Sequence, residues 1–129
     1  MEYSYSKDIS ASCEDAELKV RSVLKDVGFG ILTELSIKDA FKSKLGLEFK
    51  HYKILGACNP KLAHEAITYE NMIGILMPCN ILIIDNEDGT TKVVFPKADG
   101  LLSITENKEL INISKEVDSL LETAFSNIS

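Results

Sequence analysis

The sequence predicts an α+β fold, in which helices pack on an antiparallel sheet. Three observations predict it: strand-like apolar segments alternate with amphipathic helical segments, residues 86–89 form an acidic turn between two neighbouring strands, and a long helical stripe ends the chain. A hairpin cannot bury a face alone, so it must join the earlier strands in one sheet. The 129 residues, 45% hydrophobic and 26% charged, are expected to form a single domain over residues 1–129.

The first part of the chain predicts a strand and then a helix. Tyr3 and Tyr5 alternate with serines, which is typical of a strand. Ser12 suits a helix N-cap, and apolar residues recur at helical spacing from there to about Val27. Gly28 suits the left-handed position that follows a helix. The first helix is therefore expected to end just before Gly28.

A second strand and a short helix follow. Residues 29–35 are typical of a strand, Ser36 offers the next N-cap, and Gly46 ends the short helix. Gly28-Phe29-Gly30 does not match a dinucleotide-binding loop. It follows a helix instead of a strand, and no third glycine stands at the required spacing.

The middle of the chain predicts a strand, a helix and an irregular segment. Residues 52–57 form a strand that leads to Cys58, and Asn59 and Pro60 are well suited to open a third helix. Residues 71–77 are ambiguous, because Gly74 and Pro78 both oppose regular structure, and an irregular strand is one interpretation.

The last part predicts a hairpin and the longest helix. Residues 81–84 and 91–95 are its strands, and Asp99-Gly100 is typical of a turn. Apolar residues from Leu110 to Ala124 recur at helical spacing and predict a C-terminal helix.

Two predicted strand ends carry the side chains best suited to chemistry. Cys58 ends one strand and Cys79 directly precedes another, and each cysteine is followed by an asparagine, Asn59 or Asn80. We expect both thiols and both amides to meet at one site, together with the imidazole of His64 from the intervening helix. The 20 residues between the cysteines match neither a CxxC redox pair nor a zinc-finger spacing.

Several interpretations of this site remain open. In thiol or disulfide chemistry, Cys58 and Cys79 would be catalytic, with the helix N-terminus lowering the pKa of Cys58 and His64 acting as base. In a metal site, Cys58, His64 and Cys79 would be ligands of zinc or copper. Asn59 and Asn80 would contact a bound ligand, although capping and strand-start roles explain them too.

The alternative is a structural or interaction module without catalytic activity. Both thiols would then be small buried side chains, a common role of free cysteine. The sequence leaves open whether the protein is an enzyme.

Charge and cysteine content restrict the partners and the compartment. The 20 acidic against 14 basic side chains disfavour nucleic acid as a partner. The N-terminal residues lack a positive segment followed by an apolar run, and no apolar run is long enough to span a membrane. Three cysteines are an odd number, so free thiols in a reducing, cytoplasmic compartment are expected.

The residues that carry the candidate site also resemble a known family. Gly28-Phe29-Gly30, Gly56-Ala57-Cys58-Asn59-Pro60, Leu62-Ala63-His64 and Pro78-Cys79-Asn80 are similar to motifs of the DUF302 family, small bacterial and archaeal proteins of unassigned function. The resemblance implies an antiparallel sheet backed by helices, similar to half of the TATA-binding-protein fold, and a homodimer. Family members often have a methionine shortly after the proline that matches Pro96, whereas this chain continues with Lys97-Ala98-Asp99.

Overall fold

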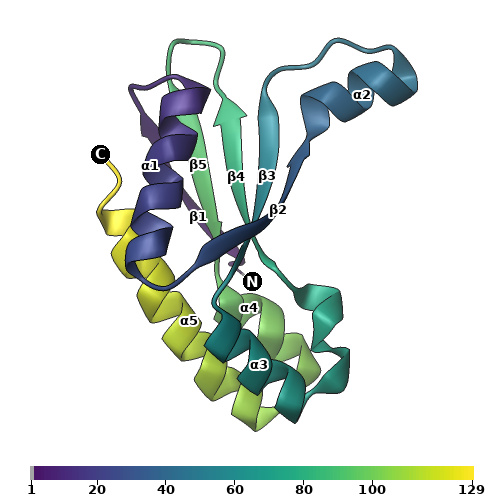
Figure 1. The fold of residues 1–129 in the computed structure, drawn as a ribbon, viewed down its shortest axis with the longest axis vertical. Helices are drawn as coiled ribbons and strands as arrows, with labels where there is room; N and C mark the ends of the chain where they lie inside the picture. The colour runs from purple at the N-terminus through teal and green to yellow at the C-terminus, as the bar shows by residue number, and fades with distance from the viewer. Residues whose placement is uncertain (1) are drawn as a thin grey trace.

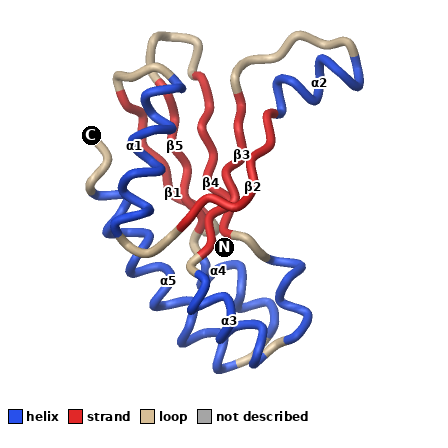
Figure 2. Tube along the Cα trace, viewed as in Figure 1, coloured by secondary structure: helices blue, strands red, loops and turns tan. Residues whose placement is uncertain are grey.

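The computed structural model describes residues 2–129 and contains a five-stranded antiparallel sheet (Figures 1 and 2). The strand order is β1-β5-β4-β3-β2, with every neighbouring pair antiparallel. The predicted α+β class is therefore confirmed. The elements in chain order are β1 (Ser4–Ile9), α1 (Cys13–Asp26), β2 (Gly30–Ser36), α2 (Ile37–Leu45), β3 (Tyr52–Cys58), α3 (Pro60–Tyr69), the 3-10 helix η1 (Asn71–Leu76), β4 (Cys79–Asp85), β5 (Thr91–Pro96), α4 (Ala98–Leu102), the 3-10 helix η2 (Ser103–Thr105) and α5 (Lys108–Ser126).

Local sequence signals place the helix ends as predicted. The side chains of Ser12, Ser36 and Asn59 each accept a hydrogen bond from a backbone N–H in the first turn of α1, α2 and α3. Gly28 and Gly46 have φ angles of 85° and 65°, the left-handed conformation that follows a helix at low cost only for glycine. These caps require nothing beyond neighbouring residues, which is why the sequence predicts them well.

The helices α1 and α5 cover one face of the sheet, here called the inner face (Figure 1). The hydrophobic core lies between this face and the two helices. Lys7 of β1 reaches the end of α5, where its Nζ donates to the backbone oxygens of Phe125 (2.7 Å) and Ile128 (2.9 Å). A cation at the last carbonyls of a helix satisfies acceptors that have no partner within the helix. The fully buried large side chains include Val20, Leu24, Leu55, Ile81, Ile83, Val93, Phe95, Leu110 and Leu121.

Residues 71–76 form a 3-10 helix, so the interpretation as an irregular strand is wrong. The buried side chain of Ile73 anchors η1, whereas Met72 and Ile75 are 70% and 85% exposed. The segment follows α3 closely and leads the chain back to the start of β4 (Figure 1). Its conformation depends on the contacts of Ile73, which lie outside the local sequence.

Asp99-Gly100 lies within the short helix α4, so the predicted turn is also wrong. The carboxylate of Asp118 in α5 accepts from the backbone N–H groups of Ala98 (2.7 Å) and Asp99 (3.0 Å). This side chain stabilises the first turn of α4 from a distant part of the chain. A Cβ atom at Gly100 would lie 2.6 Å from the backbone oxygen of Glu2, so glycine fits here because the chain approaches closely.

Candidate functional site

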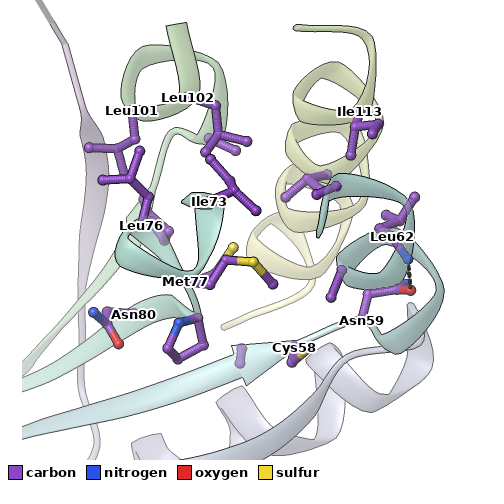
Figure 3. A pocket seen from close by; sticks show the side chains of 18 of the residues that line it. Cys58, Asn59, Leu62, Ile73, Leu76, Met77, Asn80, Leu101, Leu102 and Ile113 are labelled. Atoms are coloured by element: carbon purple, nitrogen blue, oxygen red, sulfur yellow. Dashed lines mark hydrogen bonds between the residues drawn. The ribbon is translucent and has the colours of Figure 1, made fainter. Parts of the chain in front are cut away.

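A cavity of about 280 Å³ lies at the end of the sheet where β3 ends and β4 begins (Figure 3). The walls come from α3, η1, α4 and α5, which together close the end of the core. Apolar side chains make most of the lining, and the two cysteines and two asparagines of the predicted site complete it. The lining residues are Phe29, Ala57, Cys58, Asn59, Leu62, Ala63, Ala66, Ile73, Ile75, Leu76, Met77, Pro78, Cys79, Asn80, Pro96, Ala98, Leu101, Leu102, Ile113 and Val117.

The sheet register brings Cys58 and Cys79 to the same site. Cys79 is the first residue of β4 and is paired with Ala57, the neighbour of Cys58 in β3. Both cysteines are free, and both line the cavity. The two cysteines therefore line one cavity, because the antiparallel pairing of β3 with β4 places the end of one strand beside the beginning of the other.

Both thiols are held in the neutral form. Burial is the largest of the causes that raise the pKa of Cys79 from its ordinary value of 9.0 to about 11, and the nearby Cys58 and the carboxylate of Asp118 contribute the rest of this rise. Burial also raises the pKa of Cys58. This direction is opposite to the lowering of the Cys58 pKa that was expected from the N-terminus of α3, and its cause is the loss of hydration on burial.

The two asparagines occupy different surroundings. The side-chain oxygen of Asn59 accepts from the N–H of Leu62 at 3.2 Å and caps α3 (Figure 3). Asn80 is exposed in β4, opposite Gly56 of β3. Both line the cavity, so they remain candidates for ligand contacts, although Asn59 already has a structural role.

His64 does not join the thiols. Its side chain is exposed on α3 and is not part of the cavity lining. The hydrogen bonds found among residues 2–129 include none between His64 and Cys58, which the nucleophile and base pair would need. The described residues also contain no group of three His, Cys, Asp or Glu side chains placed to hold a metal ion.

Most of the cavity wall is not evident from the sequence motifs. Ile113 and Val117 belong to the predicted stripe of the C-terminal helix, but nothing in that stripe indicates that they face a cavity. Leu76, Leu101 and Leu102 come from η1 and α4, which form where the sequence pattern predicts an irregular strand and a turn. The sequence identifies these residues as apolar. The cavity between them depends on how the helices pack, which the sequence pattern does not give.

The fold and the site define an α+β protein with an apolar cavity that contains two neutral thiols. The family model for DUF302, a domain of unknown function, matches residues 5–128, and the chain belongs to this family. The resemblance seen in the sequence is thereby confirmed.

A solved structure agrees with this assignment. The crystal structure of an uncharacterized conserved protein DUF302 from Bacillus stearothermophilus is 25% identical to this chain, with a TM-score of 0.91 and complete coverage of both chains. A search of curated proteins finds no match. Within residues 2–129, no helix combines the length and the apolar character needed to cross a membrane.

Proposed function

We propose that this protein binds a small, neutral, largely apolar molecule in the cavity at the end of the sheet. The observation that carries the proposal is the lining, which combines a continuous apolar wall with a few polar groups at one end, Cys58, Asn59, Cys79 and Asn80. Ligand pockets typically have this composition and a volume of about 300–1,000 Å³, so a cavity of about 280 Å³ suits a small molecule.

The electrostatics of the cavity favour a neutral ligand. None of the described residues that line it carries a charge, so a bound anion would find no cation there. The carboxylate of Asp118 lies close enough to raise the pKa of Cys79, and it would repel an anion in the same way. An ionic group moved from water into such surroundings loses hydration without gaining a partner.

The thiols of Cys58 and Cys79 contribute as neutral groups in this proposal. A neutral thiol is a polarizable, weak hydrogen-bond donor and acceptor, which suits contact with an apolar or aromatic molecule. The proposal also places the protein in the reducing, cytoplasmic compartment, which suits its three free cysteines.

Binding of the neutral fluorescent probe N-phenylnaphthylamine tests the proposal. We expect one probe per chain in the wild type and at least about tenfold weaker binding in Ala63→Trp, because the added indole occupies part of the cavity. Ile67→Trp is the matched control, since Ile67 lies on the same helix, is 44% exposed and does not line the cavity. Equal binding by both variants would contradict the location of the site.

The sulfonated analogue of the same probe, anilinonaphthalene sulfonate, tests the preference for neutral ligands. We expect its dissociation constant to be at least about tenfold higher than that of the neutral probe, because the sulfonate has no cation in the cavity. Titration of both probes into the same wild-type sample gives the comparison. Tighter binding of the sulfonate would show that the cavity selects anions.

A zinc or copper site at Cys58, His64 and Cys79 is the other interpretation that the sequence offers. Elemental analysis of protein purified without oxygen or chelators measures it directly. With two thiols and no third described ligand, we expect far less than one metal per chain. Near-stoichiometric zinc or copper in the wild type, and none in the double variant Cys58→Ser, Cys79→Ser, would establish a metal site. That result would contradict the proposal that the cavity binds a neutral molecule without a metal.

A further inference from the structure

Residues 70–78, which include η1, close one side of the cavity. Ile73, Leu76 and Met77 line the cavity from this segment (Figure 3). Ile75 also belongs to the lining, yet its side chain is 85% exposed. Because this residue both lines the cavity and faces solvent, the wall is thin at this place. On this side, a single layer of chain separates the cavity from solvent.

The segment is attached to the rest of the protein mainly at its two ends. At the first end, the N–H of Glu70 donates to the carbonyl oxygen of Ala66 in α3 at 2.9 Å. At the other end, Cys79 is paired with Ala57 of β3. The side-chain hydrogen bonds and ion pairs found among residues 2–129 include none that involve residues 70–78. The middle of the segment is therefore held by apolar contacts alone.

The 3-10 helix itself is weakly stabilised. The N–H groups of Ile73 and Met77 donate to carbonyl oxygens three residues earlier, at 3.1 and 3.3 Å. Six residues are long for a 3-10 helix, whose hydrogen bonds have poorer geometry than those of an α-helix. No side chain caps its beginning at Glu70, and Gly74 adds the conformational freedom of glycine. Of its six residues, Ile73 alone is buried, and segments with few buried apolar contacts open at low cost.

The other helices around the cavity are held more firmly. Asn59 caps α3, which packs Leu62 and Ala66 into the core. The carboxylate of Asp118 binds the N–H groups at the start of α4. The helix α5 has 19 residues and a continuous buried side. The wall that opens at the lowest cost is therefore η1.

We propose that η1 is a hinged lid, which opens to admit the ligand and closes over it. The hinges are residues 69–70, at the end of α3, and residues 77–78, before β4. This inference rests on the proposed binding of a small apolar molecule, and it adds how that molecule enters and leaves. In the closed lid, Ile73 and Leu76 shield the ligand from water.

Hydrogen exchange of the ligand-free protein measures the opening of the lid. We expect a peptide that covers residues 71–77 to exchange at least about 100-fold faster than the central turns of α5. Gly74→Ala should slow this exchange about two- to fivefold, because alanine loses less conformational freedom than glycine when the helix closes. Alanine fits here, since Gly74 has no positive φ and an added Cβ meets nothing within 4 Å. Exchange of residues 71–77 as slow as that of α5 would overturn the lid.

Stopped-flow fluorescence of N-phenylnaphthylamine tests whether the lid controls binding. Gly74→Ala should lower the association and dissociation rate constants by the same factor, about two- to fivefold, and leave the dissociation constant unchanged. Gly74 does not line the cavity, so the substitution stabilises the closed lid equally with and without the probe. Glu70→Asp should act in the same direction, because aspartate suits the N-cap of η1 and keeps the charge.

Gly30→Ala is the matched control for both measurements. Gly30 lies in β2, outside the cavity lining, and an added Cβ there also meets nothing within 4 Å. Its rate constants and its exchange in residues 71–77 should equal those of the wild type. A wild type that binds no probe would contradict the proposed ligand site and the lid together. Normal binding, with rate constants that Gly74→Ala and Glu70→Asp leave unchanged, would contradict the lid alone.

Discussion

Alkylation of Cys79 by iodoacetamide in the native protein at pH 8 is expected to run about 100-fold slower than alkylation of an ordinary cysteine. Only the thiolate reacts at a useful rate, and burial raises the pKa of Cys79 from 9.0 to about 11. Below both values, each unit of pKa lowers the thiolate fraction about tenfold. The rate should therefore rise about tenfold for each pH unit between pH 8 and pH 10.

Mass spectrometry of the peptide that contains Cys79 gives the rate for this thiol alone. The same reaction in urea is the control, because unfolding removes the burial and should restore the ordinary rate. Rapid alkylation of native Cys79 at pH 8 would mean that its thiolate is stabilised. That result would favour thiol chemistry at Cys58 and Cys79 over the binding of a neutral ligand.

Replacing Gly56 by alanine is expected to lower the free energy of unfolding by about 2 kcal/mol. Gly56 lies in β3 beside the site, and a Cβ atom there would collide with the hydroxyl of Thr33 and would lie 2.7 Å from Cγ of Pro78. Glycine to alanine in a strand is otherwise expected to stabilise by roughly 0.5–1 kcal/mol, so the collision must outweigh that gain. Since Pro78 directly precedes Cys79, movement of the proline should also disturb probe binding in the cavity.

Urea unfolding of three variants separates the collision from the backbone effect. Gly30→Ala is the control, because Gly30 also lies in a strand, has a negative or extended φ, and has nothing within 4 Å of an added Cβ. Adding Thr33→Ala to Gly56→Ala removes the hydroxyl and should recover part of the lost stability. A Gly56→Ala protein as stable as Gly30→Ala would show that Thr33 and Pro78 move aside at little cost.

Sequence and structure agree best where interactions are local. The N-caps at Ser12, Ser36 and Asn59 and the glycines at 28 and 46 were predictable because each acts within one helical turn. The structure differs where distant residues decide. The helix α4 begins at a segment that resembles a turn because the carboxylate of Asp118, about 20 residues later, caps it.

The candidate site was predictable in part for the same reason. Cys58 and Cys79 line one cavity because neighbouring antiparallel strands place the end of one beside the beginning of the next. His64 lies on the helix between them, and its direction depends on which side of α3 packs on the core. Leu62 and Ala66 take the buried side, so the imidazole faces solvent.

Patterns in the sequence predict the α+β class, most of the helix ends, the family and the position of the two cysteines at one end of the sheet. These follow from periodicity, capping residues and strand pairing, which are properties of short segments. The tertiary structure alone decided the cavity, the raised pKa values of Cys58 and Cys79, and the thin wall that η1 forms. Burial and the space between helices depend on how distant segments pack, and no short stretch of sequence contains that information.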